Sequence, residues 1–316
     1  MKTRSWAFTF SVLVSAAALA VPMGLGLAQT ATDQSDWEKA AGGKMEFEVA
    51  SIHLGEPGQF TPPNFALDTG NGRIPPGGRF HADFPLAVYI TFAYKLWLTS
   101  VQMDTMLAHL PKWVATDQFV IDARAEGNPT KDQMRLMVRS LLADRFKLTS
   151  HFETQETPVL AMVLAKPGKL GPNLEPHEQG PPCDAPLPPA PGKTADVFPP
   201  NCDLYVMSVG SSSNHSIRLG SRNTTMAQVA DSLPGPGRLG RPVVDETGLT
   251  GTYDFVLNFV PENYNASLSP GTTVTLDSAG PTFLEAVKDQ LGLKLIPKKA
   301  PVRILVIDHI EQPSPN

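Results

Sequence analysis

The feature of this 316-residue chain that most restricts its fold is an order of helix and strand signals that occurs twice. Each half contains four apolar residues at positions i, i+3, i+4 and i+7, the spacing that gives an amphipathic helix one apolar face. These residues are Leu86, Tyr89, Ile90 and Ala93 in the first half, and Met226, Val229, Ala230 and Leu233 in the second. We therefore expect two related α-helices, each preceded by a β-forming segment.

The signals that follow also correspond between the halves. β-Forming residues alternate over 119–123 and over 253–257, which is typical of strands with one buried face. A Thr-x-x-Gln/Glu capping box then predicts the start of a second helix in each half. The boxes are Thr130 with Gln133 and Thr282 with Glu285, and a third box, Thr225 with Gln228, begins the helix of the second apolar stripe.

Two strands are expected to close each half. They cover 148–152 and 159–164 in the first half, and 293–296 and 302–307 in the second, with turns at Pro158 and Pro301. The runs 159–164 and 302–307 are nearly all apolar, which favours a place in the middle of a sheet. A further strand is expected at 47–52, ahead of the first unit.

The order β-α-β-α-β-β thus occurs twice and predicts an α+β, or mixed α/β, protein of two tandem units with helices packed on sheets. The predicted units are residues 44–166 and 203–316. Chance similarity between α/β segments is the alternative, but the matched caps and the shared proline-plus-apolar strands favour duplication. Two separate sheets and one shared sheet are both compatible with this order.

A proline-rich loop at residues 167–202 is predicted to join the two units. Its eleven prolines exclude a helix and a central strand. Cys183 and Cys202 both lie in this loop and are the only cysteines of the chain, so in an exported protein they are expected to form a disulfide. A redox pair or a metal site is the alternative, but the spacing is far from Cys-x-x-Cys.

The first 28 residues have the pattern of a cleavable signal peptide. Lys2 and Arg4 precede an apolar run at 6–20, and small residues at 26 and 28 supply the cleavage site. An uncleaved anchor is the alternative, but the run is short for a bilayer span, which needs about 20 residues. We expect a periplasmic or extracellular mature protein with no stable membrane span after cleavage.

The charge of the mature chain argues against nucleic acid as a partner. Removal of 1–28 takes away two basic residues and no acidic ones, so the formal charge changes from −5 to −7. A mildly acidic chain without basic clusters does not favour binding to nucleic acid or to anionic lipid.

Several segments resemble a known family. They are 47–52 (FEVASI), 141–148 (LLADRFKL), 241–251 (RPVVDETGLTG) and 306–309 (VIDH), and they follow the family order. The resemblance is to an exported acidobacterial, Solibacter-type paralogous family of unknown function. Some of its members are fused to a membrane metallopeptidase of the antibiotic-sensor type. The resemblance implies an extracytoplasmic sensing or binding role and supplies no catalytic residue.

Four short motifs are better explained as turns or loops than as sites. The Gly-x-Gly-x-x-Gly of 235–240 follows a helix and precedes a strand, the reverse of a dinucleotide site. Asp68-Thr69-Gly70 and the loosely similar 276–279 match the aspartic-protease triplet but lie in Gly/Pro-rich loops. Ser211–Ser213 misses the nucleophile elbow. The seven histidines show no short metal-ligand spacing, so no cofactor and no metal are predicted.

Five residues remain as candidate ligand or partner contacts. Residues 245–251 place acids, hydroxyls and glycines between strands, which either presents Arg241, Asp245 and Thr247 to a ligand or shapes a turn. Trp97 and Trp113 form either an exposed aromatic patch or part of a core.

The sequence favours a non-catalytic extracytoplasmic binding or sensory module over an enzyme, because no nucleophile, base or metal group converges. Its expected partner is a small molecule, a cell-wall fragment or an envelope protein. A secreted hydrolase with a loop-built site and an envelope scaffold are the alternatives. A pocket with convergent acid–base groups would favour the hydrolase, and an apolar groove or an exposed sheet edge would favour binding.

Overall fold

The computed structural model describes residues 35–56, 61–72, 74–177, 206–209, 216–261 and 280–313. Four segments interpreted from the sequence fall outside these ranges. They are the signal peptide of residues 1–28, the disulfide of Cys183 with Cys202, the Ser-rich segment of residues 211–213, and the triplet-like segment of residues 276–279.

The first sheet contains three antiparallel strands in the order β1-β3-β2. Their bounds are Val49–Leu54 for β1, Arg79–Pro85 for β2 and Gln118–Arg124 for β3. One face of this sheet buries Ile52, Phe80 and Ile121 against α2 (Leu86–Ala93) and α5 (Lys131–Arg145) in the first core. The opposite face, called the outer face below, carries polar side chains.

The second sheet has the order β5-β9-β7-β6 and is also antiparallel. Its bounds are Leu174–Pro176 for β5, Val206–Val209 for β6, Ile217–Thr225 for β7 and Thr252–Phe259 for β9. The second core packs residues of α6 (Met226–Ser232) and α8 (Phe283–Leu291) against Phe255 and Leu257 of β9.

The two sheets share one arrangement of strands. In each sheet a central strand, β3 or β9, lies between an edge strand, β1 or β5, and the strand that leads into a helix, β2 or β7. Equivalent backbone bonds close the edge, from Gly55 N to Gln118 O at 2.9 Å and from His177 N to Thr252 O at 3.0 Å. The predicted extra strand β1 therefore has a counterpart, β5. Because β5 is an edge strand, Pro176 can lie in it without removing a hydrogen bond between central strands. The surrounding prolines are the reason why the sequence did not predict this strand.

The capping boxes begin the helices where the sequence placed them. Thr130, Thr225 and Thr282 each accept a backbone hydrogen bond at the starts of α5, α6 and α8. The helices that the apolar pattern did not predict are short or exposed, and their bounds are Asp36–Ala40 for α1, Ser100–Leu107 for α3, Trp113–Thr116 for α4 and Pro234–Gly237 for α7. Of these, α3 has Met106 and Leu107 partly buried against the first core and no fully buried residue, and Thr99 and Gln102 cap it in the same way as the other boxes.

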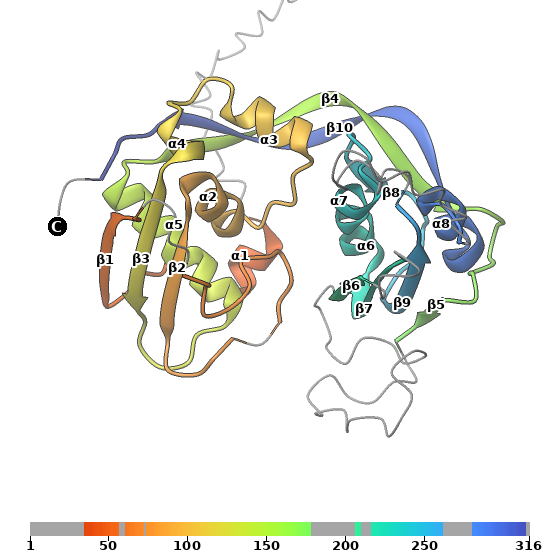
Figure 1. Cartoon of the computed structure of the whole chain (residues 1–316), viewed down its shortest axis with the longest axis horizontal. Helices are drawn as coiled ribbons and strands as arrows, with labels where there is room; N and C mark the ends of the chain where they lie inside the picture. Colours follow the sequence, from red (N-terminus) through yellow and green to blue (C-terminus); the bar gives the residue numbers. More distant parts are fainter. Residues whose placement is uncertain are drawn as a thin grey trace, which may run out of the picture. The chain divides into compact units, whose positions relative to one another are not determined.

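Two long antiparallel strands form a ribbon that belongs to both units (Figure 1). They are β4 (Thr149–Leu164) and β10 (Leu293–His309). A short parallel strand, β8 (Val243–Asp245), pairs with β4 to complete the third sheet, whose order is β10-β4-β8. The predicted turns at Pro158 and Pro301 are wrong, because both prolines lie inside continuous strands. A ribbon strand has an open edge, and a proline whose nitrogen faces that edge removes no ladder bond.

The ribbon exchanges strand ends between the two cores. Leu305, near the end of β10, is buried in the first core, whereas Met162, near the end of β4, is buried in the second. Within the third sheet, residues 160–162 of β4 take the central place that their apolar sequence predicted. The same prediction is wrong for 302–307, because β10 is the edge strand of that sheet.

Candidate functional site

A groove of about 790 Å³ separates the edge strand β1 from helix α5. We call it the β1–α5 groove. The residues that line it come from the approach to β1 and from one side of α5 and its end, and they are Lys44, Glu46, Phe47, Glu48, Val49, Ala50, Met137, Arg139, Ser140, Leu141, Ala143, Asp144, Arg145 and Lys147. Its volume lies in the range of ligand sites.

The backbone of β1 borders this groove. The guanidinium of Arg145 donates to the carbonyl oxygen of Ala50 at 3.5 Å, so that carbonyl points away from β3 and toward α5. In an antiparallel strand, the N–H and C=O of one residue point to the same side, which also places the N–H of Ala50 on the groove side. Within the described ranges, β3 is the one strand that pairs with β1.

The floor of the groove is apolar and its rim is charged. Met137 and Leu141 lie one helical turn apart on α5 and are 4% and 8% exposed. Lys44 and Glu46 form an exposed ion pair at 2.7 Å on the rim, and the hydrogen bond between them raises the pKa of Lys44 and lowers that of Glu46. An apolar floor with a polar rim is typical of binding sites.

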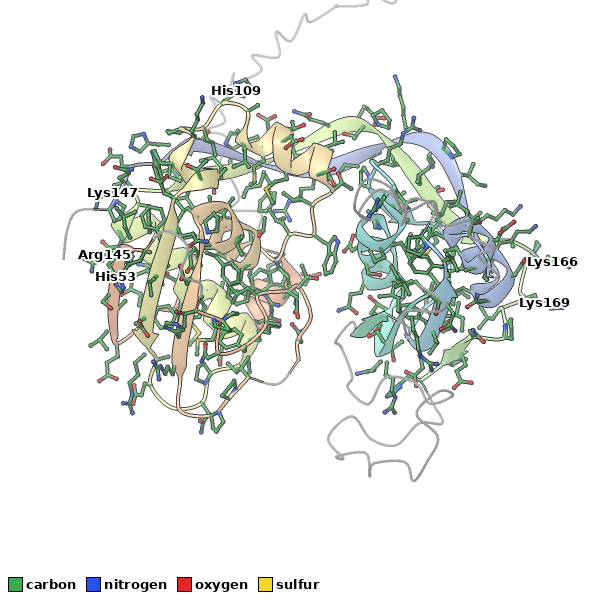
Figure 2. The ribbon with its side chains drawn as sticks, viewed as in Figure 1. His53, His109, Arg145, Lys147, Lys166 and Lys169 are labelled. Carbon is green, nitrogen blue, oxygen red and sulfur yellow. The ribbon has the colours of Figure 1, made fainter. Side chains whose placement is uncertain are left out.

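The end of α5 brings two further cations to this groove. The chain turns at Lys147 with a φ of 52°, and its ammonium donates to the carbonyl oxygen of Asp144 at 2.7 Å. Figure 2 labels Arg145 and Lys147 at this end of the helix. Cations at the C-terminal end of a helix are favourable because its dipole is negative there.

The corresponding space in the second unit is closed. The backbone N–H groups of Gly171 and Asn173, just before β5, donate to the carbonyl oxygens of Leu291 and Gln290 at the end of α8. A side chain at Gly171 would come within 2.3 Å of the Gln290 carbonyl oxygen. In the second unit, the chain leading into the edge strand β5 is therefore bonded directly to the end of α8. In the first unit, a groove separates the edge strand β1 from α5.

A second hollow, of about 620 Å³, lies on the outer face of the first sheet. We call it the outer-face hollow. Its residues are Val49, Ala50, Ser51, Gly77, Arg79, Asp122, Ala123 and Arg124. Because Val49 and Ala50 also line the β1–α5 groove, the edge of β1 has a hollow on each side.

The outer face also holds a histidine–carboxylate pair. Nδ1 of His81 lies 2.8 Å from a carboxylate oxygen of Asp122, and the guanidinium of Arg79 lies 3.5 Å from the same oxygen. Nε2 of His81 is buried and has no hydrogen-bond partner in the part of the chain that the structure describes. A carboxylate at Nδ1 orients an imidazole, but general-base catalysis also needs a nucleophile at Nε2.

A buried ion network near the Asp68-Thr69-Gly70 triplet is structural. Arg135 has no exposed side-chain surface and donates to the carbonyl oxygens of Asp68 and Gly70 at 2.8 and 2.7 Å, while it also contacts Asp132. Lys131 binds the Asp68 carboxylate at 2.5 Å, and burial lowers the pKa of Lys131. These bonds fix the loop of residues 65–72 on α5. The loosely similar triplet at 276–279 lies outside the described residues.

The structure does not gather the five candidate contact residues into one site. Trp113 stacks on Phe146 with the ring centroids 6.4 Å apart, as part of the first core, and Trp97 is half-buried. Asp245 accepts hydrogen bonds from the amide and the hydroxyl of Thr247 at 2.9 and 2.8 Å, which makes this segment an Asx turn after β8. Arg241 is exposed beside it.

Reasoning from the sequence missed the β1–α5 groove. A strand was correctly expected at 47–52, but edge position depends on which strands pair, and pairing is not visible in one strand's sequence. Val49 and Leu54 are apolar, and only the structure shows that both are 61% exposed.

The described residues contain no recognisable metal-ion site. No group of three or more His, Cys, Asp or Glu side chains there is arranged to hold a metal ion. Among the same residues, every helix is too short or too polar to traverse a lipid bilayer.

A comparison with protein families gave one match. Residues 87–310 match a family model described as a protein of unknown function, DUF3738. This span includes α5 and both strands of the ribbon, whereas β1 and β2 precede it. Comparisons with curated proteins and with solved structures gave no match.

Proposed function

Because the chain belongs to the DUF3738 family of proteins of unknown function, its role has to be argued from its own geometry, and we propose that it is a non-catalytic binding module that takes an extended polypeptide segment as an added strand on β1. The observation that carries this proposal is the edge strand with a hollow on each side. In strand addition, main-chain hydrogen bonds supply affinity, and pockets for alternate side chains supply specificity.

An extended polypeptide fits this edge better than a small molecule does. The side chains of a strand point alternately to its two faces. Beside β1, successive side chains of an added strand would therefore enter the β1–α5 groove and the outer-face hollow in turn. The six residues of β1 provide an edge of about 20 Å, at roughly 3.3 Å per residue.

The exposed surface of β1 supports the same ligand. Val49 and Leu54 are 61% exposed at the two ends of the strand, and Ala50 directs its backbone toward the groove. An exposed edge with apolar side chains normally invites pairing with another chain, and proteins that do not use such an edge protect it. In the second unit, the corresponding edge strand β5 is short, and the residues just before it are bonded to the end of α8.

We also propose that the module acts outside the cytoplasm, after cleavage of residues 1–28. The basic start, the apolar run and the small residues at 26 and 28 support this location. The bound segment would then belong to an envelope protein or to the peptide part of a cell-wall fragment, and its capture would serve sensing or attachment.

The test uses the mature chain and a random linear-peptide phage library, followed by affinity measurement with the enriched peptides as synthetic probes. In Ala50→Pro, the backbone loses the N–H that faces the groove, whereas the β1–β3 ladder keeps its bonds. We expect at least a tenfold loss of peptide affinity with a nearly unchanged melting temperature.

Ser100→Pro is the matched control, because a proline at the first position of a helix is tolerated and Ser100 begins α3 away from β1. It should keep full peptide affinity. Failure to enrich any peptide, or full affinity of Ala50→Pro for the enriched peptides, would overturn the proposal.

A secreted hydrolase is the second candidate, because the His81–Asp122 pair has the arrangement of an oriented base. Turnover of p-nitrophenyl esters or of casein by the mature chain, lost in His81→Gln, would favour it. The absence of turnover would leave the binding module as the better explanation of the same surface.

A further inference from the structure

Two arginines lie directly opposite each other on the outer face of the first sheet. Arg79 of β2 and Arg124 of β3 are register partners, and both line the outer-face hollow. Like charges at directly opposed positions of an antiparallel pair destabilise a sheet. Such a pair needs an anion nearby to become favourable.

The protein's own carboxylates compensate this pair in part. Asp122 is the one carboxylate among the residues that line the hollow. Two side chains share one of its oxygens, since Nδ1 of His81 lies 2.8 Å away and the guanidinium of Arg79 lies 3.5 Å away. Arg124 makes no ion pair with any carboxylate of the described residues. The hollow therefore has an excess of positive charge in a chain whose net charge is −5.

The second unit shows how the same scaffold neutralises an arginine on the corresponding strand. Arg222 of β7 is buried, and its Nε lies 3.5 Å from a carboxylate oxygen of Asp254 on the neighbouring β9. The same carboxylate accepts from the backbone of Asn223 at 2.8 Å and contacts His177 at 2.6 Å. Arg222 therefore matches Arg79, which lies on the equivalent strand β2 and contacts Asp122, whereas Arg124 on the central strand β3 faces the open hollow without an ion pair among the described residues.

We infer that the outer-face hollow binds a carboxylate of the polypeptide segment, held by the guanidinium groups of Arg124 and Arg79. Arginine suits this ligand because its planar fork matches the two oxygens of a carboxylate. The wall at Gly77 carries no side chain, which leaves space above the arginines. The identity of the ligand as a polypeptide rests on the proposed function, whereas the carboxylate site follows from the arginine pair.

The register places the acidic residue of the ligand. Val49, Arg124 and Arg79 form one row across the sheet. An added strand beside β1 would present a side chain opposite Val49, about 10 Å from Arg124, because neighbouring strands are roughly 4.8 Å apart. A glutamate and an arginine side chain together span that distance above Val49. We therefore expect a Glu or Asp at this position of the bound segment.

The first arm of the test uses a probe without a peptide backbone long enough for strand addition. N-acetylglutamate amide is titrated into the mature chain labelled with ¹⁵N at arginine, with N-acetylglutamine amide as the neutral control. We expect the Nε resonances of Arg124 and Arg79 to shift with the acid and not with the amide. In Arg124→Gln, the shift at Arg79 should fall at least threefold, and Lys112→Gln, an exposed charge of α4's N-cap, should change nothing. Equal responses to acid and amide would overturn the inference.

The second arm uses the peptides enriched by phage display. Replacement of their acidic residue by glutamine should weaken binding about tenfold to the wild type and little to Arg124→Gln. If Ala50→Pro abolishes peptide binding but Arg124→Gln leaves it unchanged, strand addition stands and the carboxylate site falls. If no peptide binds but N-acetylglutamate amide still shifts Arg124, the carboxylate site stands and the proposed function falls.

Discussion

The guanidinium of Arg135 donates a hydrogen bond to the carbonyl oxygen of Gly70, 2.7 Å away, from a side chain without exposed surface. A buried charge of this kind is stable because both terminal nitrogens of the guanidinium have partners, and loss of the guanidinium leaves buried polar groups unpaired in a medium of low dielectric constant. The bond connects a loop without regular structure to the helix that forms one wall of the β1–α5 groove.

Arg135→Leu should therefore destabilise the protein by about 3 kcal/mol, since two buried backbone carbonyl groups lose this donor and Asp132 keeps Lys95 but loses its bond with Arg135. Urea unfolding followed by circular dichroism measures this loss. Lys112→Leu, at an exposed position, should change the free energy of unfolding by less than about 0.5 kcal/mol. Similar stabilities of the two variants would show that the network contributes little.

The capping box of α5 gives a second prediction. The hydroxyl of Thr130 accepts from the backbone N–H of Gln133 at 3.2 Å. Thr130→Ala should cost about 1 kcal/mol of unfolding free energy, and Thr130→Ser should restore most of it, because serine caps equally well. Urea denaturation of the two variants measures the difference, and an unchanged midpoint in Thr130→Ala would contradict the role of the cap.

The ribbon should respond to pH through His151. Its ring nitrogens contact Asp308 of β10 at 2.9 Å and Glu153 at 3.1 Å, and these hydrogen bonds raise its pKa above the ordinary value of 6.5. A raised folded-state pKa contributes stability that is complete below the ordinary value and is lost as the pH rises through the raised value.

An NMR titration of the His151 ring should give a midpoint above 6.5, and Asp308→Asn should lower this midpoint. A midpoint at or below 6.5 in the wild type would show that the contact with β10 does not persist in solution.

The arginine pair predicts a gain of stability on mutation. Arg124→Thr removes one of two opposed positive charges and introduces a β-former, so the protein without ligand should become more stable by about 0.5 kcal/mol. Arg79→Thr should give a smaller gain, because Arg79 also loses its contact with Asp122. Thermal unfolding of both variants at low and high salt measures these gains. The gain of each variant over the wild type should shrink as salt screens the charges.

The disulfide between Cys183 and Cys202 remains a prediction from the sequence. Closing a loop of this length stabilises a fold by roughly 3 kcal/mol in the chain-entropy model. Cys183→Ser should lower the melting temperature of oxidised protein and leave that of reduced protein unchanged. Equal melting of the wild type in both redox states would exclude the bond.

Local signals in the sequence were sufficient to predict the starts of the capped helices and the two central strands. The capping boxes at Thr130, Thr225 and Thr282 mark real helix starts, because a cap is satisfied within four residues and does not depend on the rest of the chain. The alternation at 119–123 and at 253–257 marks the central strands β3 and β9 for the same reason.

Features that depend on distant pairing were not predictable. Pro158 and Pro301 suggest turns when each is considered alone, and they fit into strands because β4 and β10 pair with each other across about 150 residues of sequence. The β1–α5 groove has the same origin, since an alternating strand becomes an edge only through the order of its neighbours. At Asp245 and Thr247 the sequence allowed either a ligand-binding loop or a turn, and the structure shows that these polar residues bond to each other in a turn.

The exchanged ends of the ribbon determine when the protein can finish folding. Leu305 and Ile52 belong to the same core although they lie far apart in the chain. The first core therefore cannot be completed before β10 has been synthesised, and a polypeptide truncated before β10 would lack residues of both cores.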